Sequence, residues 1–369
     1  MANDDRISTR QFTVLVLFIT LGDILLVVPS MVAAFVKQDL WISGLVGVFA
    51  GLPVALLLYA YGTVSAGTGF VGYNRRLLGR WAGGLVSIVY IVYFLYNCSM
   101  MVRETGDFLT TQLFPETPLR AIHVLAVTAM VVGAKYGLQT IARSGEIFLP
   151  FYVFLYLMLV VLLLPKIDAA RLQPILGSGM PELLHGSLLA ASFPFCELCV
   201  IFLIVPHVVR SSHLARDYII AVILGGCGIF VIDLLAVLAL GGKMTAHFIY
   251  PTYILAQKIS IGHFVERLEA LLAINHILST YLKTTLYFYA FSEVIAQLFK
   301  LPDYRSLVIP SGLIVFGMAY LVSSDVLFFN DMAVRYWVDM DVLAGFALPL
   351  LLLVVHKLKS GRSKRPSNA

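Results

Sequence analysis

The chain has 369 residues, of which 60% are hydrophobic and only 13% are charged, and its mean hydropathy is +0.90. This composition excludes a secreted enzyme, a cytosolic two-domain enzyme and a nucleic-acid-binding protein. We therefore expect an integral membrane protein in contact with membrane lipid, whose formal net charge of +5 has to be interpreted from where the charges lie relative to the bilayer.

Apolar stretches long enough to cross a bilayer recur along the whole chain. A helix needs about 20 residues to cross a hydrocarbon core of about 30 Å. The stretches are continuously apolar rather than alternating, which indicates helices and not barrel strands. The sequence therefore predicts an all-α polytopic membrane protein with ten transmembrane helices, near residues 11–36, 40–61, 81–111, 119–136, 146–164, 186–208, 217–240, 264–297, 306–323 and 339–357.

The first and sixth stretches are both interrupted. Gly22 and Asp23 break the first, and Ser192 and Pro194 lie in the break of the sixth. Glycine lacks a Cβ and proline lacks a backbone donor, so both weaken a helix. The alternative is that glycine and proline are simply common in membrane helices and bind nothing.

Interruptions at equivalent positions of two halves favour an inverted-repeat transporter core with a binding site near the bilayer midplane. Five spans in each half predict a 5+5 inverted repeat of the leucine-transporter type, with broken helices 1 and 6. We expect a single transmembrane domain over 1–369, with repeats at 11–164 and 186–357.

The basic residues of the short loops predict the orientation. Sixteen Lys and Arg lie on the side of the N-terminus and seven on the opposite side. Because cytoplasmic loops are enriched in these residues, both termini are expected in the cytoplasm. Residues 1–10 form the expected cytoplasmic N-terminus, and 358–369 a basic cytoplasmic tail.

Ionisable residues at membrane depth indicate a functional site, because they are costly unless they face a cavity or a partner. Asp23 and Glu197 follow the two breaks, where they either cap a half-helix or favour a sugar or a cationic ligand. Lys283 in the eighth span must either pair with a carboxylate or deprotonate, and Glu104 or Glu197 is the expected partner.

Polar residues on one face of the third span extend this site. Tyr96, Met100 and Glu104 recur every four residues, which favours a cavity-lining role over packing alone. The expected ligand-binding residues are Gly22, Asp23, Tyr96, Asn97, Met100, Glu104, Ser192, Glu197, Leu198, Lys283 and Thr284.

No soluble catalytic motif competes with this interpretation. The chain has no Walker loop, no H-E-x-x-H and no G-x-S-x-G motif, and its eight histidines show no metal-ligand spacing. We therefore expect no enzyme activity, no catalytic residue, no metal and no cofactor.

Three motifs resemble the B-subunit family of bacterial spore germination receptors, which is related to the amino acid-polyamine-organocation permeases. They are Ile7-Ser8-Thr9-Arg10-Gln11, Tyr250-Pro251-Thr252 and Phe264-Val265-Glu266-Arg267-Leu268-Glu269-Ala270-Leu271. The resemblance covers essentially the whole chain. The chain departs from it at Ile274-Asn275-His276, where many relatives have a tryptophan.

The resemblance implies a subunit of the spore inner membrane that senses a small nutrient germinant and triggers germination. It further implies a receptor A subunit and a lipoprotein C subunit as partners, and a site lined by the first, third, sixth and eighth spans. The germinant stays open among amino acids, sugars and nucleosides.

The alternative function is a proton- or sodium-coupled amino acid permease, since buried titratable groups also suit coupling. Glu266 and Glu269 either begin a solvated helix or contact a partner subunit.

Overall fold

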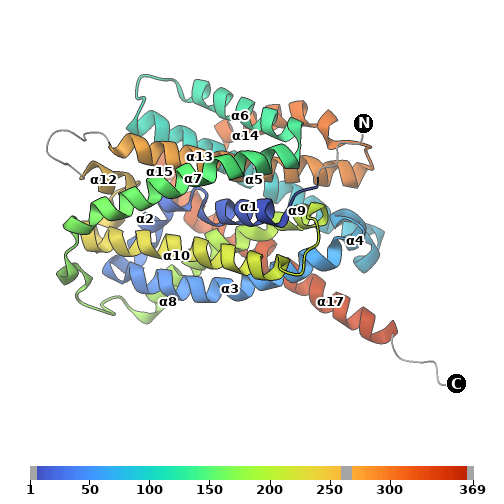
Figure 1. Cartoon of the computed structure of the whole chain (residues 1–369), viewed down its shortest axis with the longest axis horizontal. Coiled ribbons are helices and arrows are strands. Elements are labelled where there is room, and N and C mark those ends of the chain that lie inside the picture. The colour runs from blue at the N-terminus through green and yellow to red at the C-terminus, as the bar shows by residue number, and fades with distance from the viewer. Residues whose placement is uncertain (1–5, 259–267, 364–369) are drawn as a thin grey trace.

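The structure is a computed structural model that describes residues 6–258 and 268–363. The Glu266-Arg267 part of the third motif, the expected start of the eighth span at 264 and the end of the basic tail lie outside the described residues. The described part of the chain is almost entirely helical (Figure 1). The only strand-like pairing in it is one isolated bridge, between Ile7 and Val208.

The first half of the chain forms the helices of the first five expected spans and a short basic helix between the second and third. The first span is divided into two helices. The elements are α1 (Thr9–Leu21), α2 (Ile24–Val36), η1 (Lys37–Asp39), α3 (Leu40–Ser65), α4 (Phe70–Leu78), α5 (Arg80–Gln112), α6 (Leu119–Tyr136), α7 (Leu138–Leu163), η2 (Leu164–Lys166) and η3 (Ala169–Leu172).

The second half has more irregular helix. Its elements are α8 (Met180–Ala191), η4 (Ser192–Cys196), η5 (Glu197–Val200), α9 (Ile201–Ile204), η6 (Val205–His207), α10 (Leu214–Leu240), α11 (Gly242–His247), α12 (Pro251–Gln257), α13 (Leu268–Phe299), η7 (Tyr304–Ser306), α14 (Val308–Leu321), α15 (Val326–Met332), η8 (Ala333–Trp337), α16 (Val338–Asp341), η9 (Val342–Ala347) and α17 (Leu348–Ser363).

Seven helical stretches of the described chain are long and apolar enough to cross a membrane. They include every expected span except the eighth, the ninth and the first half of the first. Helices α1 and α14 are apolar but shorter, and α13 is long but polar along one side. The polar side of α13 is buried, with Asn275, Ser279, Lys283 and Thr284 among its residues.

The two interruptions differ in form. The first span is broken at Gly22 and Asp23, between α1 and α2. The sixth span stays helical but changes pitch, because Ser192–Cys196 is a π-helical turn and Glu197–Val200 a 3-10 turn. Pro194 lies in the π turn and has no backbone N–H to donate, which explains why regular hydrogen bonding fails there.

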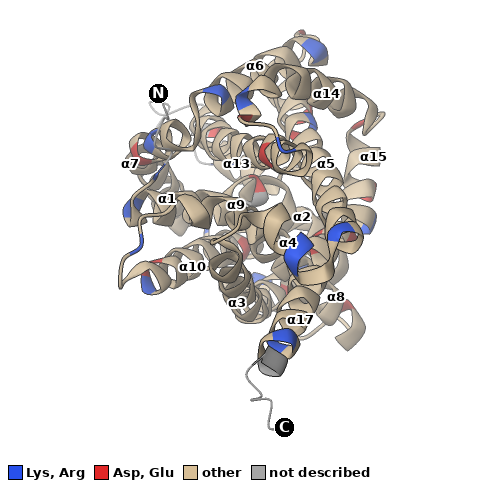
Figure 2. Ribbon diagram, turned by 90° about the vertical axis from the view of Figure 1, so that its right-hand side faces the viewer, with Lys and Arg blue, Asp and Glu red and all other residues tan. Residues whose placement is uncertain are grey.

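These two irregular spans meet in the interior of the bundle. Helix α1 packs against α7, α10 and α13, while α2 packs against α8 and α12, and η4 contacts both α1 and α2. Figure 1 shows α1 between α7 and α10, with its start at the same end of the bundle as the end of α17. Figure 2 looks onto that end and shows Lys and Arg on α4 and α17.

The outside of the bundle is apolar. Large side chains such as Phe49, Trp81, Leu125 and Leu313 are exposed there. A surface of this kind is compatible with lipid but would be a liability in water. The architecture therefore has an apolar outer surface around a mainly apolar core, within which a smaller set of polar and charged side chains is buried.

Candidate functional site

The interruption of the first span lies directly against α13. Ser279 of α13 donates a hydrogen bond from Oγ to the carbonyl oxygen of Gly22 at 2.7 Å. A Cβ at Gly22 would lie 2.3 Å from Cδ of Lys283, closer than carbon atoms approach. The lysine side chain can therefore pass the break only because residue 22 has no side chain.

Lys283 links the two irregular spans through a buried ion cluster. Its Nζ lies 2.5 Å from Oδ1 of Asp23 and also forms an ion pair with Oε2 of Glu197. All three side chains are buried, and Lys283 and Glu197 are 0% exposed. Buried charges are tolerated only when they are paired, so this cluster holds α13 to both the first and the sixth span.

Glu104 and Glu197 are the alternative partners that the sequence predicts for Lys283, and the structure distinguishes them. The ion pair with Glu197 is confirmed. The expectation for Glu104 is wrong, since no ion pair joins it to Lys283 in the described structure, and Asp23 takes that position instead. Asp23 is free to do so because its side chain makes no capping hydrogen bond to α2.

The tenth span adds two residues that the sequence did not predict. Asp341 accepts a hydrogen bond at Oδ1 from the Tyr93 hydroxyl at 2.8 Å, and Trp337 donates from Nε1 to Oδ1 of Asn97 at 2.9 Å. Both residues are buried. Asp341 is a carboxylate within an expected span, a signal that by itself marks a functional position.

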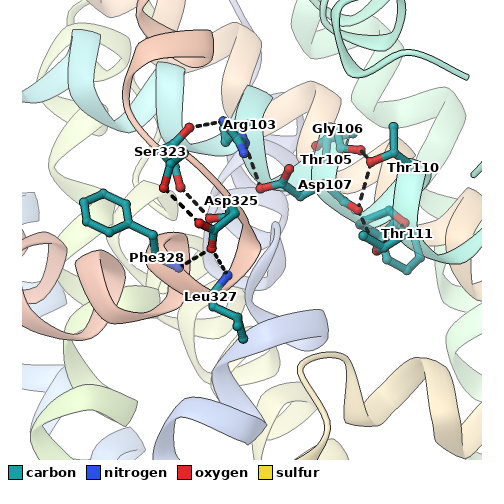
Figure 3. A network of polar contacts seen from close by, with 12 residues as sticks. Arg103, Thr105, Gly106, Asp107, Thr110, Thr111, Ser323, Asp325, Leu327 and Phe328 are labelled. Atoms are coloured by element: carbon teal, nitrogen blue, oxygen red, sulfur yellow. Dashed lines mark hydrogen bonds and ion pairs between the residues drawn. The ribbon is translucent and has the colours of Figure 1, made fainter.

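Glu104 and its neighbours on α5 divide between two environments. Glu104 is buried, and neither of its carboxylate oxygens has a hydrogen-bond partner in the described chain. The adjacent Arg103 donates from Nε to Oδ2 of Asp107 at 2.8 Å and from Nη1 to the Ser323 carbonyl (Figure 3). Arg103 is therefore occupied on its own side of α5 and does not neutralise Glu104.

The same network anchors the start of α15. Asp325 accepts hydrogen bonds at Oδ1 from the backbone N–H groups of Leu327 and Phe328, each at 2.9 Å (Figure 3). The hydrogen bond from the Phe328 backbone and that from the Ser324 hydroxyl lower the pKa of the Asp325 carboxyl below its ordinary value, because they favour the ionised form.

The remaining predicted residues lie around the cluster in different environments. Ser192 donates its hydroxyl back to the Leu188 carbonyl at 2.8 Å, while Met100 and Leu198 are buried in the apolar core. The hydroxyl of Tyr96 is buried without a hydrogen-bond partner in the described residues. Thr284 lines a separate cavity, so the eleven predicted residues do not form one continuous lining.

That separate cavity has a volume of about 450 Å³ and lies between α5, α6 and α13. Its lining is mainly apolar, with Met101, Thr105, Thr280 and Tyr281 beside Thr284. A second cavity, of about 10 Å³, lies beside the break and is lined by Gly22, Asn275, His276 and Ser279 among others. The second is large enough for about one water molecule.

The first sequence motif closes one end of the bundle. The backbone N–H of Ile7 donates to the His207 carbonyl at 3.0 Å, and that of Val209 donates to the Ile7 carbonyl at 2.9 Å. Ser8 and Gln11 form a reciprocal capping box at the start of α1. The motif therefore ties the start of the first span to the end of the sixth.

The second motif packs against the break of the first span. Thr252 donates from Oγ1 to the Leu25 carbonyl at 2.5 Å, which ties α12 to the first turn of α2. The ring of Tyr250 packs edge-on against Phe108 of α5, with centroids 5.2 Å apart. The first motif thus lies at the start of the broken first span, and the second lies beside its break, two residues from Asp23 of the ion cluster.

Over the described ranges, no group of three His, Cys, Asp or Glu side chains is arranged to hold a metal ion. The centre itself offers one buried ammonium group, several carboxylates and backbone carbonyl groups at the interrupted helices.

Comparison with known proteins identifies the family of this chain. A family model described as "Spore germination protein" matches residues 6–325. The chain is 25% identical to spore germination protein KB of Bacillus subtilis (strain 168), over 87% of this chain and 86% of that protein. It is 28% identical to spore germination protein YndE of the same strain, over 97% of this chain and 98% of that protein. The chain belongs to the spore germination protein family.

Solved structures show the same fold at low sequence identity. MhsT in complex with L-phenylalanine aligns with a TM-score of 0.66 at 15% identity, covering 94% of this chain and 97% of that one. Mhp1, a nucleobase-cation-symport-1 family transporter in a closed conformation with bromovinylhydantoin bound, aligns with a TM-score of 0.69 at 15% identity, covering 94% and 78%. The expected leucine-transporter-like architecture is confirmed. These relatives are germination proteins and transporters rather than enzymes.

Proposed function

We propose that this chain is the germinant-sensing membrane subunit of a spore germination receptor, which binds a small nutrient near the bilayer midplane and triggers germination. The observation that supports this most directly is the buried cluster of Lys283, Asp23 and Glu197. It joins both irregular helices to α13 within a fold that the compared transporters share. A ligand that changes the balance of charge there can therefore move both spans at once.

The proposed ligand-binding residues are those predicted from the sequence, with Asp341 and Trp337 added. The proposal groups them around the break at Gly22 and Asp23 because half-helix ends and free carbonyl groups are the usual ligand contacts in this architecture. Thr284 belongs to this set only if the binding space extends into the cavity of about 450 Å³ beside α13.

We further propose that the protein lies in the spore inner membrane with both termini in the cytoplasm, or spore core. The start of α1 and the end of α17 lie at one end of the bundle (Figure 1), which agrees with an even number of spans. The excess of Lys and Arg in the loops on that side supports its assignment as the inner side. Single cysteines introduced at Ser360 and Ser178 should differ in accessibility to an impermeant thiol reagent, whereas equal accessibility would contradict this topology.

The domain organisation and partners complete the proposal. The chain would act as one transmembrane domain, with repeats at 11–164 and 186–357, and assemble with a receptor A subunit and a lipoprotein C subunit. Family membership supports receptor partners of this kind. Co-purification of all three subunits with a tagged copy of this chain would support the assembly, and recovery of this chain alone would argue against it.

The functional experiment uses spores in which a variant is the only copy of this subunit. Met100→Ala and Thr284→Val change the binding region without removing a buried charge, so the subunit level measured by immunoblot should stay near normal. The nutrient concentration for half-maximal germination should shift. If neither variant alters sensitivity or maximal response, the proposed binding region is wrong.

The alternative is a proton- or sodium-coupled permease for amino acids. The buried titratable groups suit coupling, but the compared relatives are named for germination, and the transporters share only the fold. Gradient-driven accumulation of the nutrient distinguishes the two functions.

A further inference from the structure

A basic cleft opens at the end of the bundle where α17 ends. It lies between α4, the start of α5 and the end of α13, and its volume is about 810 Å³. Figure 2 looks onto this end and shows α4 beside α17. The lining includes the cations Arg75, Arg80 and Lys300, and none of the described residues that line the cleft is acidic. The cleft therefore carries positive charge that its own lining does not neutralise.

These cations have unused donors. No ion pair joins Arg75, Arg80 or Lys300 to a carboxylate in the described structure. Arg75 donates from Nη2 to the Leu298 carbonyl at 3.2 Å, but its Nε is buried and has no hydrogen-bond partner in the same ranges. The nearby Glu293 accepts a hydrogen bond from the amide of Gln297 at 2.9 Å. A buried donor without an acceptor is costly, and an anion in the cleft supplies the acceptor.

The start of α5 adds to the positive field of the cleft. The helix begins at Arg80 after Gly79, which has no side chain to cap it, and its first turn contains no acid. The first N–H groups of a helix have no acceptor within the helix, and its dipole is positive at this end. Guanidinium groups and helix starts are both suited to phosphate, so the cations and the start of α5 indicate the same class of anion.

The cleft lies where these helices leave the apolar part of the bundle. The third span begins at Arg80, and α13 ends at Phe299, directly before Lys300. Trp81, next to Arg80, is 89% exposed, and Phe299, which lines the cleft, is 69% exposed. Exposed aromatic rings at the ends of spans are typical of the membrane-water interface. The cations are therefore at the depth of lipid headgroups, with aromatic side chains turned outward beside them.

We infer that the basic cleft binds the phosphate group of an anionic phospholipid, with Arg75, Arg80 and Lys300 as its cationic contacts and the rings of Trp81 and Phe299 beside its acyl chains. Basic pockets between membrane helices on the cytoplasmic side suit such headgroups. A soluble phosphate would satisfy the cations but would leave the exposed rings without an apolar partner. The inference goes beyond the proposed function, because the cleft shares no lining residue with the cavities of about 450 and 10 Å³.

The test measures the unfolding midpoint of the purified full-length protein in an uncharged detergent. Phosphatidylglycerol is added in one series, and phosphatidylcholine with the same acyl chains, which has no net charge, in another. A ligand that binds the folded state raises the midpoint as it saturates its site. Phosphatidylglycerol should raise the midpoint saturably, and phosphatidylcholine should not at the same concentration. Glycerol 3-phosphate and inorganic phosphate, which have no acyl chains, should also have no effect over that range.

Two double variants then assign the effect to the cleft. Arg80→Gln with Lys300→Gln removes two exposed charges of the lining, and each basic residue at an anionic surface is worth a factor of about five in affinity. Half-maximal stabilisation should therefore need at least about tenfold more phosphatidylglycerol. Arg143→Gln with Arg210→Gln is the matched control, because it removes two exposed charges near the start of α1, outside the cleft, and should leave that concentration unchanged. The comparison of the two lipids needs no variant, so it remains decisive if a variant fails to fold.

Four results would overturn the inference. Equal stabilisation by the two lipids would refute recognition of the headgroup, and equal stabilisation by glycerol 3-phosphate or inorganic phosphate would replace the lipid with a soluble phosphate. An equal loss in the two double variants would reduce the effect to general attraction between a basic surface and an anionic micelle. No stabilisation by phosphatidylglycerol would leave the cleft to an acidic segment of a partner protein. Each of these results leaves the proposed nutrient sensing standing, because no nutrient is present in the assay.

Discussion

Replacing Lys283 with methionine tests the buried cluster most severely. Methionine keeps much of the volume of the lysine stem but removes the ammonium group, which leaves Asp23 and Glu197 buried without a cation. Removing one partner of a buried ion pair typically costs about 3–5 kcal/mol. That is roughly two to nearly four orders of magnitude in the ratio of folded to unfolded protein.

Restoring neutrality should recover most of this loss. The triple variant Asp23→Asn, Lys283→Met, Glu197→Gln removes all three charges, and neutral replacements of whole buried ion clusters are often tolerated. The double variant Lys283→Met, Glu104→Gln serves as the control, because Glu104 forms no ion pair with Lys283 in the described structure and its neutralisation leaves Asp23 and Glu197 stranded.

The assay is the fraction of monodisperse protein that survives heating in detergent, measured by fluorescence-detected size-exclusion chromatography, with the protein level in membranes measured beside it. Lys283→Met should be much less stable than the wild type, and the triple variant should approach it. A single variant as stable as the wild type, or a triple variant no better than the single, would refute the role given to this cluster.

Two further predictions concern close packing and pH. Gly22→Ala should lower thermal stability and weaken ligand response, because its Cβ would meet Cδ of Lys283 at 2.3 Å, whereas Gly84→Ala on α5, where the new Cβ meets nothing within 4 Å, should be neutral or slightly stabilising in the same heating assay. The pKa of the Asp325 carboxyl is lower in the folded state than its ordinary value of about 3.9. The ionised carboxylate therefore stabilises the folded state at pH values above about 3.9, and this contribution is lost as the pH falls through the folded-state pKa. Asp325→Asn should therefore give a flatter dependence of the unfolding midpoint on pH below about pH 4, and an unchanged slope would contradict this assignment.

The sequence predicts the fold well because a bilayer imposes a length and a polarity on each helix. The expected third, fourth and seventh spans agree closely with α5, α6 and α10. Hydropathy is least informative at α13, whose buried polar residues include Asn275, Ser279 and Lys283. The sequence predicts a span at 264–297, yet α13 is not among the helices of the described chain that are apolar enough to cross a membrane.

The site could be predicted only in part because pairing depends on three-dimensional packing. Periodicity indicates that Glu104 and Lys283 face the interior, but not which carboxylate the ammonium reaches. Asp23 reaches it because Gly22 leaves space for the lysine stem, a close approach that no sequence pattern specifies. Asp341 was detectable as an acid within a span, but its partner Tyr93 is 248 positions away in the chain.

The family motifs also gain a physical meaning that the sequence does not state. Ile7 pairs through its backbone with the segment after the sixth span, and Thr252 bonds to the Leu25 carbonyl in α2. The pairing of Ile7 uses only backbone groups and the bond of Thr252 is accepted by a backbone carbonyl, so neither contact specifies the type of residue at its partner position. These contacts therefore could not be predicted from residue types.

The central claim is that this chain senses a nutrient rather than pumping it. The most direct measurement uses the purified protein in liposomes, with a radiolabelled nutrient that triggers germination of wild-type spores, under an imposed proton or sodium gradient and after its collapse by an ionophore. The account predicts saturable binding that is independent of the gradient and no accumulation of nutrient in the lumen. Accumulation that depends on the gradient and is abolished by the ionophore would contradict it and identify the protein as a coupled permease.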